Sequence, residues 1–108
     1  MAGPEAHIEK YLKQRVTDEG GLCMKCTGFK DAPDRIVILS GMTVFVEVKA
    51  EGEVPRDSQI RMFNKMVEAG GFVFVIDTKD KVEAFIDFVT QDMDALTEEP
   101  SPIIRLNS

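Results

Sequence analysis

The sequence lacks the features that mark exported, membrane-spanning or disulfide-stapled chains. Its 108 residues include two cysteines, one histidine and no tryptophan. Two cysteines do not make a disulfide framework, and no apolar run approaches the roughly 18 residues that a membrane span needs. The first residues show no basic-then-apolar pattern of a secretory signal. We therefore expect a cytoplasmic protein with no membrane partner.

An excess of positive charge is missing too, because the formal net charge is −6. This charge argues against salt-insensitive coating of DNA. The acid is concentrated, however: residues 77–99 hold 2 basic and 8 acidic residues, whereas residues 1–76 hold 10 basic and 11 acidic residues. The first three quarters of the chain are thus close to neutral, and a phosphate ligand stays compatible with them, above all if some carboxylates hold a cation.

Length and composition predict one globular domain over residues 1–108. The chain is 44% hydrophobic and 30% charged, and at this length it can bury one core without covalent staples. We expect the core to span residues 5–90 approximately, followed by a C-terminal extension over 91–108. The apolar segment 103–106 of that extension needs a burial partner, and a second copy of the chain would supply one.

Hydrophobic periodicity predicts a helix, three strands, a helix, a strand and a helix. The expected helices cover 5–16, 58–69 and 80–89, the last with a possible extension toward Leu96, and the expected strands cover 22–27, 35–39, 43–49 and 72–76. The solid apolar run at 72–76 is typical of a strand buried on both faces. Two strands flank a turn signal at Ser40-Gly41 and form a hairpin, and the second continues into a right-handed βαβ unit. The fold class is therefore α/β, a single small domain with a mixed β-sheet flanked by helices in the order αβββαβα.

Charged residues gather at the open end of the expected hairpin. Asp34 heads one strand, while Glu47 and Lys49 share one face of its partner, so strand pairing brings the three together. Two carboxylates at a half-buried sheet end repel unless a cation joins them. Carboxylate oxygens and the main-chain carbonyl of Val48 suit Mg²⁺ or Mn²⁺, and Lys49 would then face a phosphate and its attacking water. Spacing alone leaves an exposed Glu47–Lys49 ion pair at a sheet edge as an equal alternative.

Other polar residues are less distinctive by themselves. Glu9 borders the apolar stripe of its helix, where a solvated charge is an equal alternative. Gln59 opens a helix directly after Ser58, the expected N-cap, near N–H groups that suit a phosphate, yet a neutral first-turn residue is the better reading. Cys23 and Cys26 are best read as reduced thiols, because structural zinc needs about four ligands. The basic residues beside Asp34 and Gln59 are hypothetical phosphate contacts, each more readily an ordinary surface charge: Lys30, Arg35, Arg56 and Arg61.

The ordered set of motifs resembles the virus-type replication-repair nuclease (VRR-NUC) family. The matching pieces run from about Glu5 to Phe88 in the family's order: Glu9, Ala32-Pro33-Asp34-Arg35-Ile36-Val37, Phe45-Val46-Glu47-Val48-Lys49, Gln59 and Gly70-Gly71-Phe72-Val73. The resemblance implies a restriction-endonuclease-like PD-(D/E)XK core. It also implies that Glu9, Asp34 and Glu47 are acidic metal-site residues, that Lys49 is the catalytic lysine and that Gln59 lies beside the site. One departure is Asp31-Ala32, where the family shows a small residue first.

These observations lead to two functional hypotheses. The first is a DNA endonuclease that depends on Mg²⁺ or Mn²⁺ and hydrolyses phosphodiester bonds. By the resemblance it would act as a homodimer on branched or junction DNA, in phage replication, repair or recombination within the bacterial cytoplasm. The second is a non-catalytic acidic protein-binding module on a nuclease-like scaffold. A degenerate scaffold would be expected to lose a carboxylate or the lysine, and here every element is present.

Overall fold

A computed structural model describes residues 3–92 and 104–105 of the chain. It contains the helices α1 (Ala6–Asp18), α2 (Asp57–Glu68) and α3 (Lys79–Asp87), a π-helical turn η1 (Phe88–Asp92) and the strands β1 (Leu22–Lys25), β2 (Arg35–Leu39), β3 (Met42–Val48), β4 (Val73–Ile76) and β5 (Ile104–Arg105). The first seven elements along the chain follow the predicted order of one helix, three strands, a helix, a strand and a helix.

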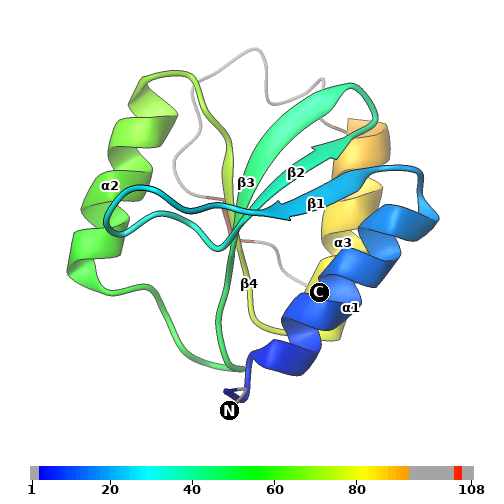
Figure 1. The fold of residues 1–108 in the computed structure, drawn as a ribbon, viewed down its shortest axis with the longest axis horizontal. Helices are drawn as coiled ribbons and strands as arrows, with labels where there is room; N and C mark the ends of the chain where they lie inside the picture. The colour runs from blue at the N-terminus through cyan, green and yellow to red at the C-terminus, as the bar shows by residue number, and fades with distance from the viewer. Residues whose placement is uncertain (1–2, 93–103, 106–108) are drawn as a thin grey trace.

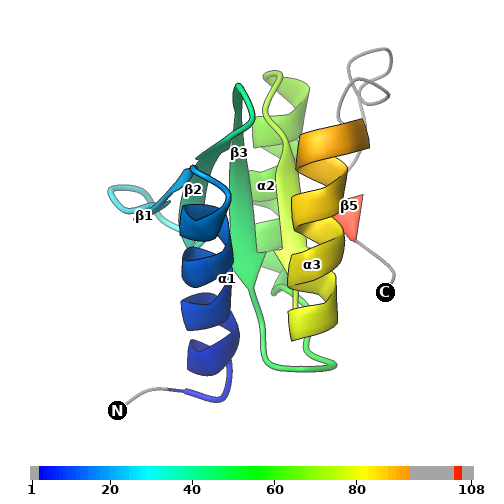
Figure 2. The ribbon, with the colours of Figure 1, turned by 90° about the vertical axis from the view of Figure 1, so that its right-hand side faces the viewer.

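The strands form one mixed sheet in the order β1-β2-β3-β4-β5. The pairs β1–β2 and β2–β3 are antiparallel, whereas β3–β4 and β4–β5 are parallel. Helices α1 and α3 cover one face of the sheet, and α2 covers the opposite face (Figures 1 and 2). This arrangement confirms the predicted α/β class with a mixed sheet flanked by helices.

The main core lies between the sheet and the helix pair α1–α3. Alternate residues of β3, among them Val44 and Val46, point into it and are fully buried. The rings of Phe74 and Phe85 meet edge to face there, with centroids 4.9 Å apart, a favoured geometry for aromatic pairs. All four residues of β4 are buried, and Phe63 of α2 is buried on the other side of the sheet. The prediction of a strand buried on both faces is therefore confirmed.

Several predicted boundaries are wrong by one or two residues. Helix α1, for example, ends at Asp18 rather than at residue 16. Strand β1 ends at Lys25 rather than at residue 27, although the Cys26 N–H still donates to the carbonyl of Asp34 at 2.9 Å. The chain then enters a loop in which Gly28 has φ 106° and Asp31 has φ 64°, backbone conformations outside the β region. Helix α3 ends at Asp87 and passes into the π-helical turn, and its suggested extension toward Leu96 lies outside the described residues.

The C-terminal residues Ile104 and Arg105 add a strand that the sequence pattern did not predict. They pair in parallel with Phe74 and Val75 of β4. A strand of two residues is too short to show any periodicity, so pattern analysis could not find it. The backbone of this part of the apolar segment 103–106 thus has a partner in its own chain, and the rest of the segment lies outside the described residues.

The parallel pair β3–β4 brings the carboxyl ends of both strands to one edge of the sheet. The Lys49 N–H continues the ladder by donating to the Ile76 carbonyl at 2.9 Å. The first turns of α1 and α3 lie at the same edge (Figures 1 and 2). In open α/β sheets, ligands bind at this edge, and the candidate site residues lie there.

Candidate active site

Asp34 lies beside Glu47 because of the hairpin register. Arg35 faces Val46 across the β2–β3 ladder, so the preceding residue faces Glu47. The carboxylate oxygen Oδ2 of Asp34 accepts the Val48 N–H at 2.7 Å. This bond fixes the Asp34 side chain at the end of β3, where the sequence places it.

Glu47, Lys49 and Gln59 form a closed triangle of hydrogen bonds. Lys49 Nζ lies 2.9 Å from Glu47 Oε2 and donates to Gln59 Oε1 at 3.0 Å, while Gln59 Nε2 donates to Glu47 Oε2 at 2.9 Å. The Glu47 side chain is 3% exposed and that of Lys49 is 15% exposed. The ion pair is therefore not the exposed sheet-edge pair of the alternative reading, since β3 lies inside the sheet and its end is covered.

The start of α2 explains how Gln59 reaches this triangle. The helix begins at Asp57 with Arg56 at the N-cap position, so the prediction of Ser58 as the N-cap is wrong. Gln59 is the third helical residue, and its Oε1 accepts the Arg56 N–H at 2.9 Å, as in a capping box. One side chain thus caps the helix and holds two site residues, while Ser58 Oγ donates to Asp31 Oδ1 at 3.2 Å instead.

Both site carboxylates are destabilised in their charged form. Burial is the largest cause that raises the pKa of Glu47, and the nearby Asp34 charge adds to it, against the hydrogen bond from Lys49. Burial also raises the pKa of Asp34, against the hydrogen bond from the Val48 N–H, and the Glu9 charge raises it further. Within the described chain, the buried oxygen Oε1 of Glu47 has no hydrogen-bond partner. The carboxylates of Asp34 and Glu47 therefore have too little positive charge around them, and a bound cation would supply it.

Glu9 reaches the same edge from α1 but is engaged elsewhere. Its Oε2 accepts from Arg35 Nε at 2.6 Å. Residues 3–92 and 104–105 contain no group of three or more His, Cys, Asp or Glu side chains arranged to hold an ion. The available donor set is therefore the carboxylates of Asp34 and Glu47 with the Val48 carbonyl. It fits Mg²⁺ or Mn²⁺, which bind one or two carboxylates and keep several waters; a direct role of Glu9 stays a prediction.

These residues line a polar cavity of about 250 Å³. Its wall is made of Glu5, Glu9, Asp34, Glu47, Val48, Lys49, Ala50, Glu53, Arg56 and Gln59. Sequence reasoning missed Glu5 and Glu53. Glu5 precedes Glu9 by four residues, so their shared helix face was a usable signal, whereas no pattern marks Glu53 in its loop.

The four predicted phosphate contacts differ in their surroundings. Arg56 is on the cavity wall and its side chain is 72% exposed. Lys30 and Arg61 are exposed as well. The Arg35 side chain is only 12% exposed and is bound to Glu9, so a phosphate would have to replace that ion pair. Contact with nucleic acid stays a prediction for all four.

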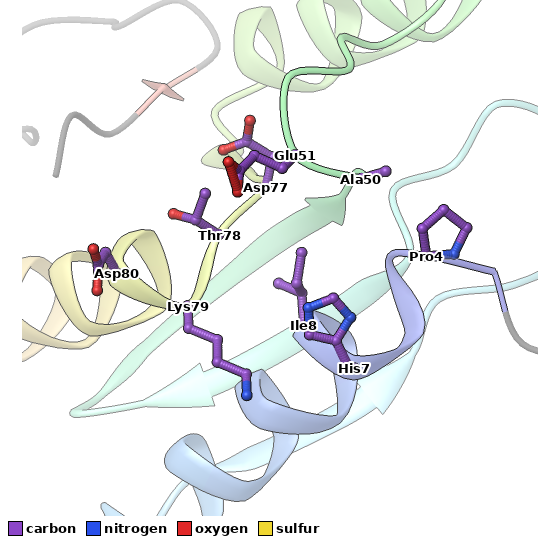
Figure 3. A pocket seen from close by; sticks show the side chains of 9 residues that line it. All are labelled: Pro4, His7, Ile8, Ala50, Glu51, Asp77, Thr78, Lys79 and Asp80. Carbon is purple, nitrogen blue, oxygen red and sulfur yellow. The ribbon is translucent and has the colours of Figure 1, made fainter.

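A larger cavity of about 680 Å³ lies next to the site. It shares Ala50 with the site and lies between the start of α1, the chain after β3 and the start of α3 (Figure 3). Its lining includes His7 and Lys79 as well as the acidic residues Glu51 and Asp77. It holds none of the residues that carry the candidate chemistry, so volume alone does not locate the active site.

Comparison with known proteins identifies the family. No family model matches the chain. A relative named "Putative nuclease p44", from Acyrthosiphon pisum secondary endosymbiont phage 1, is 39% identical over 79 residues, which cover 70% of this chain and 85% of the relative. A solved structure described as "VRR_NUC domain" superposes with a TM-score of 0.74 at 37% identity and covers 80% of this chain and 97% of its own. The fold agrees with the restriction-endonuclease-like core that the motifs imply. The chain belongs to the virus-type replication-repair nuclease (VRR-NUC) family.

Proposed function

We propose that the protein is a metal-dependent DNA endonuclease that hydrolyses phosphodiester bonds. The observation that carries this proposal is the buried triangle of Glu47, Lys49 and Gln59 beside Asp34, with the Glu47 Oε1 oxygen unpartnered in the described chain. Membership of the VRR-NUC family and the phage relative named as a nuclease support it. By the same resemblance, the protein would act in phage replication, repair or recombination in the cytoplasm of a bacterial host.

Asp34, Glu47 and the Val48 carbonyl would hold Mg²⁺ or Mn²⁺. When bound, the ion would supply Lewis-acid activation of the phosphate and of its attacking water. Glu9 is a further acid on the cavity wall, and its charge acts on Asp34. Burial raises the pKa of Asp34 and of Glu47, so a bound cation would stabilise their charged forms, and carboxylate oxygens are ligands that these hard ions prefer.

Lys49 would bind and neutralise the phosphate. Its ammonium is held by Glu47 and Gln59, which leaves one of its three N–H donors to face the cavity. In that place it would donate to a phosphate oxygen, stabilise the charge that grows there and orient the nucleophile. Gln59 would keep the ammonium in place, and Arg56 at the rim would contact the backbone of the DNA.

The proposal includes a homodimer that acts on branched DNA. A domain of this size offers little surface to a DNA junction, and a two-fold pair of sites suits the cutting of two strands. Sedimentation of the protein alone tests the dimer, and a comparison of a four-way junction with a linear duplex of the same sequences tests the preference. A monomer, or equal cleavage of both substrates, would remove that part of the proposal.

The central test measures cleavage of both DNA substrates with Mg²⁺, with Mn²⁺ and with EDTA. We expect cleavage with either metal and none in EDTA. Lys49→Ala should abolish cleavage and keep Mn²⁺ binding in calorimetry, because the metal oxygens stay in place. Lys65→Ala is the matched control, since Lys65 is exposed on α2 away from the cavity. Absence of both Mn²⁺ binding and cleavage in the wild-type protein would favour the protein-binding module.

A further inference from the structure

Asp31 joins two segments of the active site that are far apart in the sequence. Its Oδ1 accepts from Ser58 Oγ at 3.2 Å and lies 3.7 Å from Nη2 of Arg56. Both partners belong to the start of α2, whereas Asp31 lies in the loop before β2. The Asp31 side chain is only 13% exposed, and a carboxylate removed from water to this degree depends on such partners.

The two joined segments carry different parts of the site. Asp34 follows Asp31 by three residues and supplies a metal-site carboxylate. Gln59 follows Ser58 directly and holds both Lys49 and Glu47. The sheet fixes Asp34 through its bonds with the Val48 and Cys26 N–H groups, whereas α2 lies on the far side of the sheet from α1 and α3 (Figure 2). The Asp31 contact therefore ties the start of α2 to the fixed Asp34 segment.

The backbone of Asp31 adopts an uncommon conformation. Its φ of 64° is in the left-handed region, where residues other than glycine are uncommon. Such conformations persist where the surrounding contacts determine them, often at functional sites. Glycine would adopt the conformation freely but would bring no carboxylate to Ser58.

We propose that Asp31 is a positioning residue that sets the placement of Gln59 relative to Asp34, and through Gln59 that of the Lys49 ammonium. This inference rests on the proposed nuclease function. The hydrogen bond with Ser58 is the main contact, because the Arg56 side chain is 72% exposed and ion pairs of that kind contribute little. Asp31 touches none of the candidate metal ligands. Its only contact with a proposed DNA-binding residue is the weak, exposed pair with Arg56, so it acts mainly by holding the start of α2 through Ser58.

Steady-state cleavage of the DNA junction in Mn²⁺ by four variants tests this role. Asp31→Gly keeps the backbone conformation and removes the carboxylate, and Ser58→Ala removes the same hydrogen bond from the other side. We expect each to lower kcat about tenfold, the equivalent of one hydrogen bond of about 1.4 kcal/mol, with KM nearly unchanged. Asp31→Asn keeps an acceptor for Ser58 and tolerates the backbone conformation, so it should restore most of kcat. The double variant Asp31→Gly with Ser58→Ala should be no slower than either single variant.

A second measurement separates this inference from the proposed function. Amide hydrogen exchange at residues 57–61 of the metal-free protein should be faster in Asp31→Gly and Ser58→Ala and should return to the wild-type rate in Asp31→Asn. If the wild-type protein cleaves no DNA, the proposed function fails, and the exchange rates still decide whether Asp31 holds α2. Unchanged exchange, unchanged kcat in Asp31→Gly, a rise in KM alone, or an Asn variant as slow as the Gly variant would each overturn the proposal.

Discussion

Glu47→Gln should stabilise the protein while it removes the proposed activity. Burial and the neighbouring Asp34 charge raise the pKa of Glu47 above its ordinary value. The pKa is raised although the hydrogen bonds with Lys49 and Gln59 lower it, so the surroundings as a whole disfavour the charged form of Glu47. Glutamine resembles the protonated carboxyl group in shape and stays neutral at every pH. The amide group of glutamine also offers N–H donors beside Asp34, whose charge acts against the charged form of Glu47.

The magnitude follows from the buried oxygen Oε1 of Glu47, which has no hydrogen-bond partner in the described chain. An unsatisfied buried polar atom costs about 1–3 kcal/mol, and Glu47→Gln can replace it with an amide N–H that donates, so we expect a gain of about 1 kcal/mol in the free energy of unfolding at neutral pH. For a domain of this size that gain raises Tm by about 4–8 °C.

The gain should depend on pH with a defined sign. Below the ordinary pKa of 4.5, Glu47 is protonated in the folded and unfolded chains alike, and the variant has no advantage. As the pH rises through the raised pKa of the folded state, the wild-type protein loses stability and the variant does not. The advantage is therefore full above that pKa.

Thermal unfolding of both proteins in EDTA, followed by circular dichroism from pH 4 to pH 8, measures this difference. Glu83→Gln is a control of opposite sign, because the Arg15 and Tyr11 hydrogen bonds lower the pKa of Glu83. The contribution of Glu83 is present above pH 4.5 and is lost as the pH falls through its lowered pKa, so its replacement should destabilise the protein at neutral pH. A Glu47→Gln protein that melts at or below the wild-type temperature at pH 7.5 would refute the reasoning.

Three further predictions concern the metal, the cap and the core. Mn²⁺ at 100 times its Kd should stabilise the wild-type protein by about 2.7 kcal/mol in thermal unfolding and should have no effect on Glu47→Gln; equal shifts in both would place the ion elsewhere. Gln59→Leu should cost about 1–3 kcal/mol in urea unfolding, because buried partners in Glu47 and Lys49 and the Arg56 N–H each lose a hydrogen bond, and it should slow DNA cleavage in a kinetic assay. Phe85→Ala should cost about 3–5 kcal/mol in the same unfolding measurement, because this fully buried ring contacts Phe74; a loss below 1 kcal/mol would mean that the core repacks.

The sequence predicts those parts of the site that depend on strand register. Asp34 and Glu47 meet because a hairpin with a short turn has one register, and Glu47 and Lys49 share a face because side chains alternate along a strand. The order of the elements and the mixed sheet follow from periodicity in the same way. These arguments use only local geometry, and the structure agrees with them.

The contacts that sequence reasoning could not predict depend on how helices and loops dock. The ion pair of Arg35 with Glu9 needs the rotation of α1 over the sheet, and the contact of Asp31 with Ser58 needs the path of a loop. The same limit explains the wrong N-cap, because the Gln59 side chain caps the helix from a position that also reaches Lys49. Sequence spacing gives the residue types of a site, whereas the partners of each side chain come from tertiary packing.

A comparison within the protein separates the candidate site from a structural ion pair. Glu83 meets Arg15 and Tyr11 between α1 and α3, and these partners lower its pKa, as a stabilising pair should. Glu47 also has a close cationic partner in Lys49, yet its pKa is raised, and that of Asp34 is raised with it. Burial is the main cause of this difference, because the Glu83 side chain is 42% exposed whereas that of Glu47 is 3% exposed. Burying the charges of Asp34, Glu47 and Lys49 together costs folding free energy, and a cation-binding phosphodiesterase site would require such a cluster. The hydrophobic core, rather than the contacts within the site, therefore supplies the stability that holds the site in place.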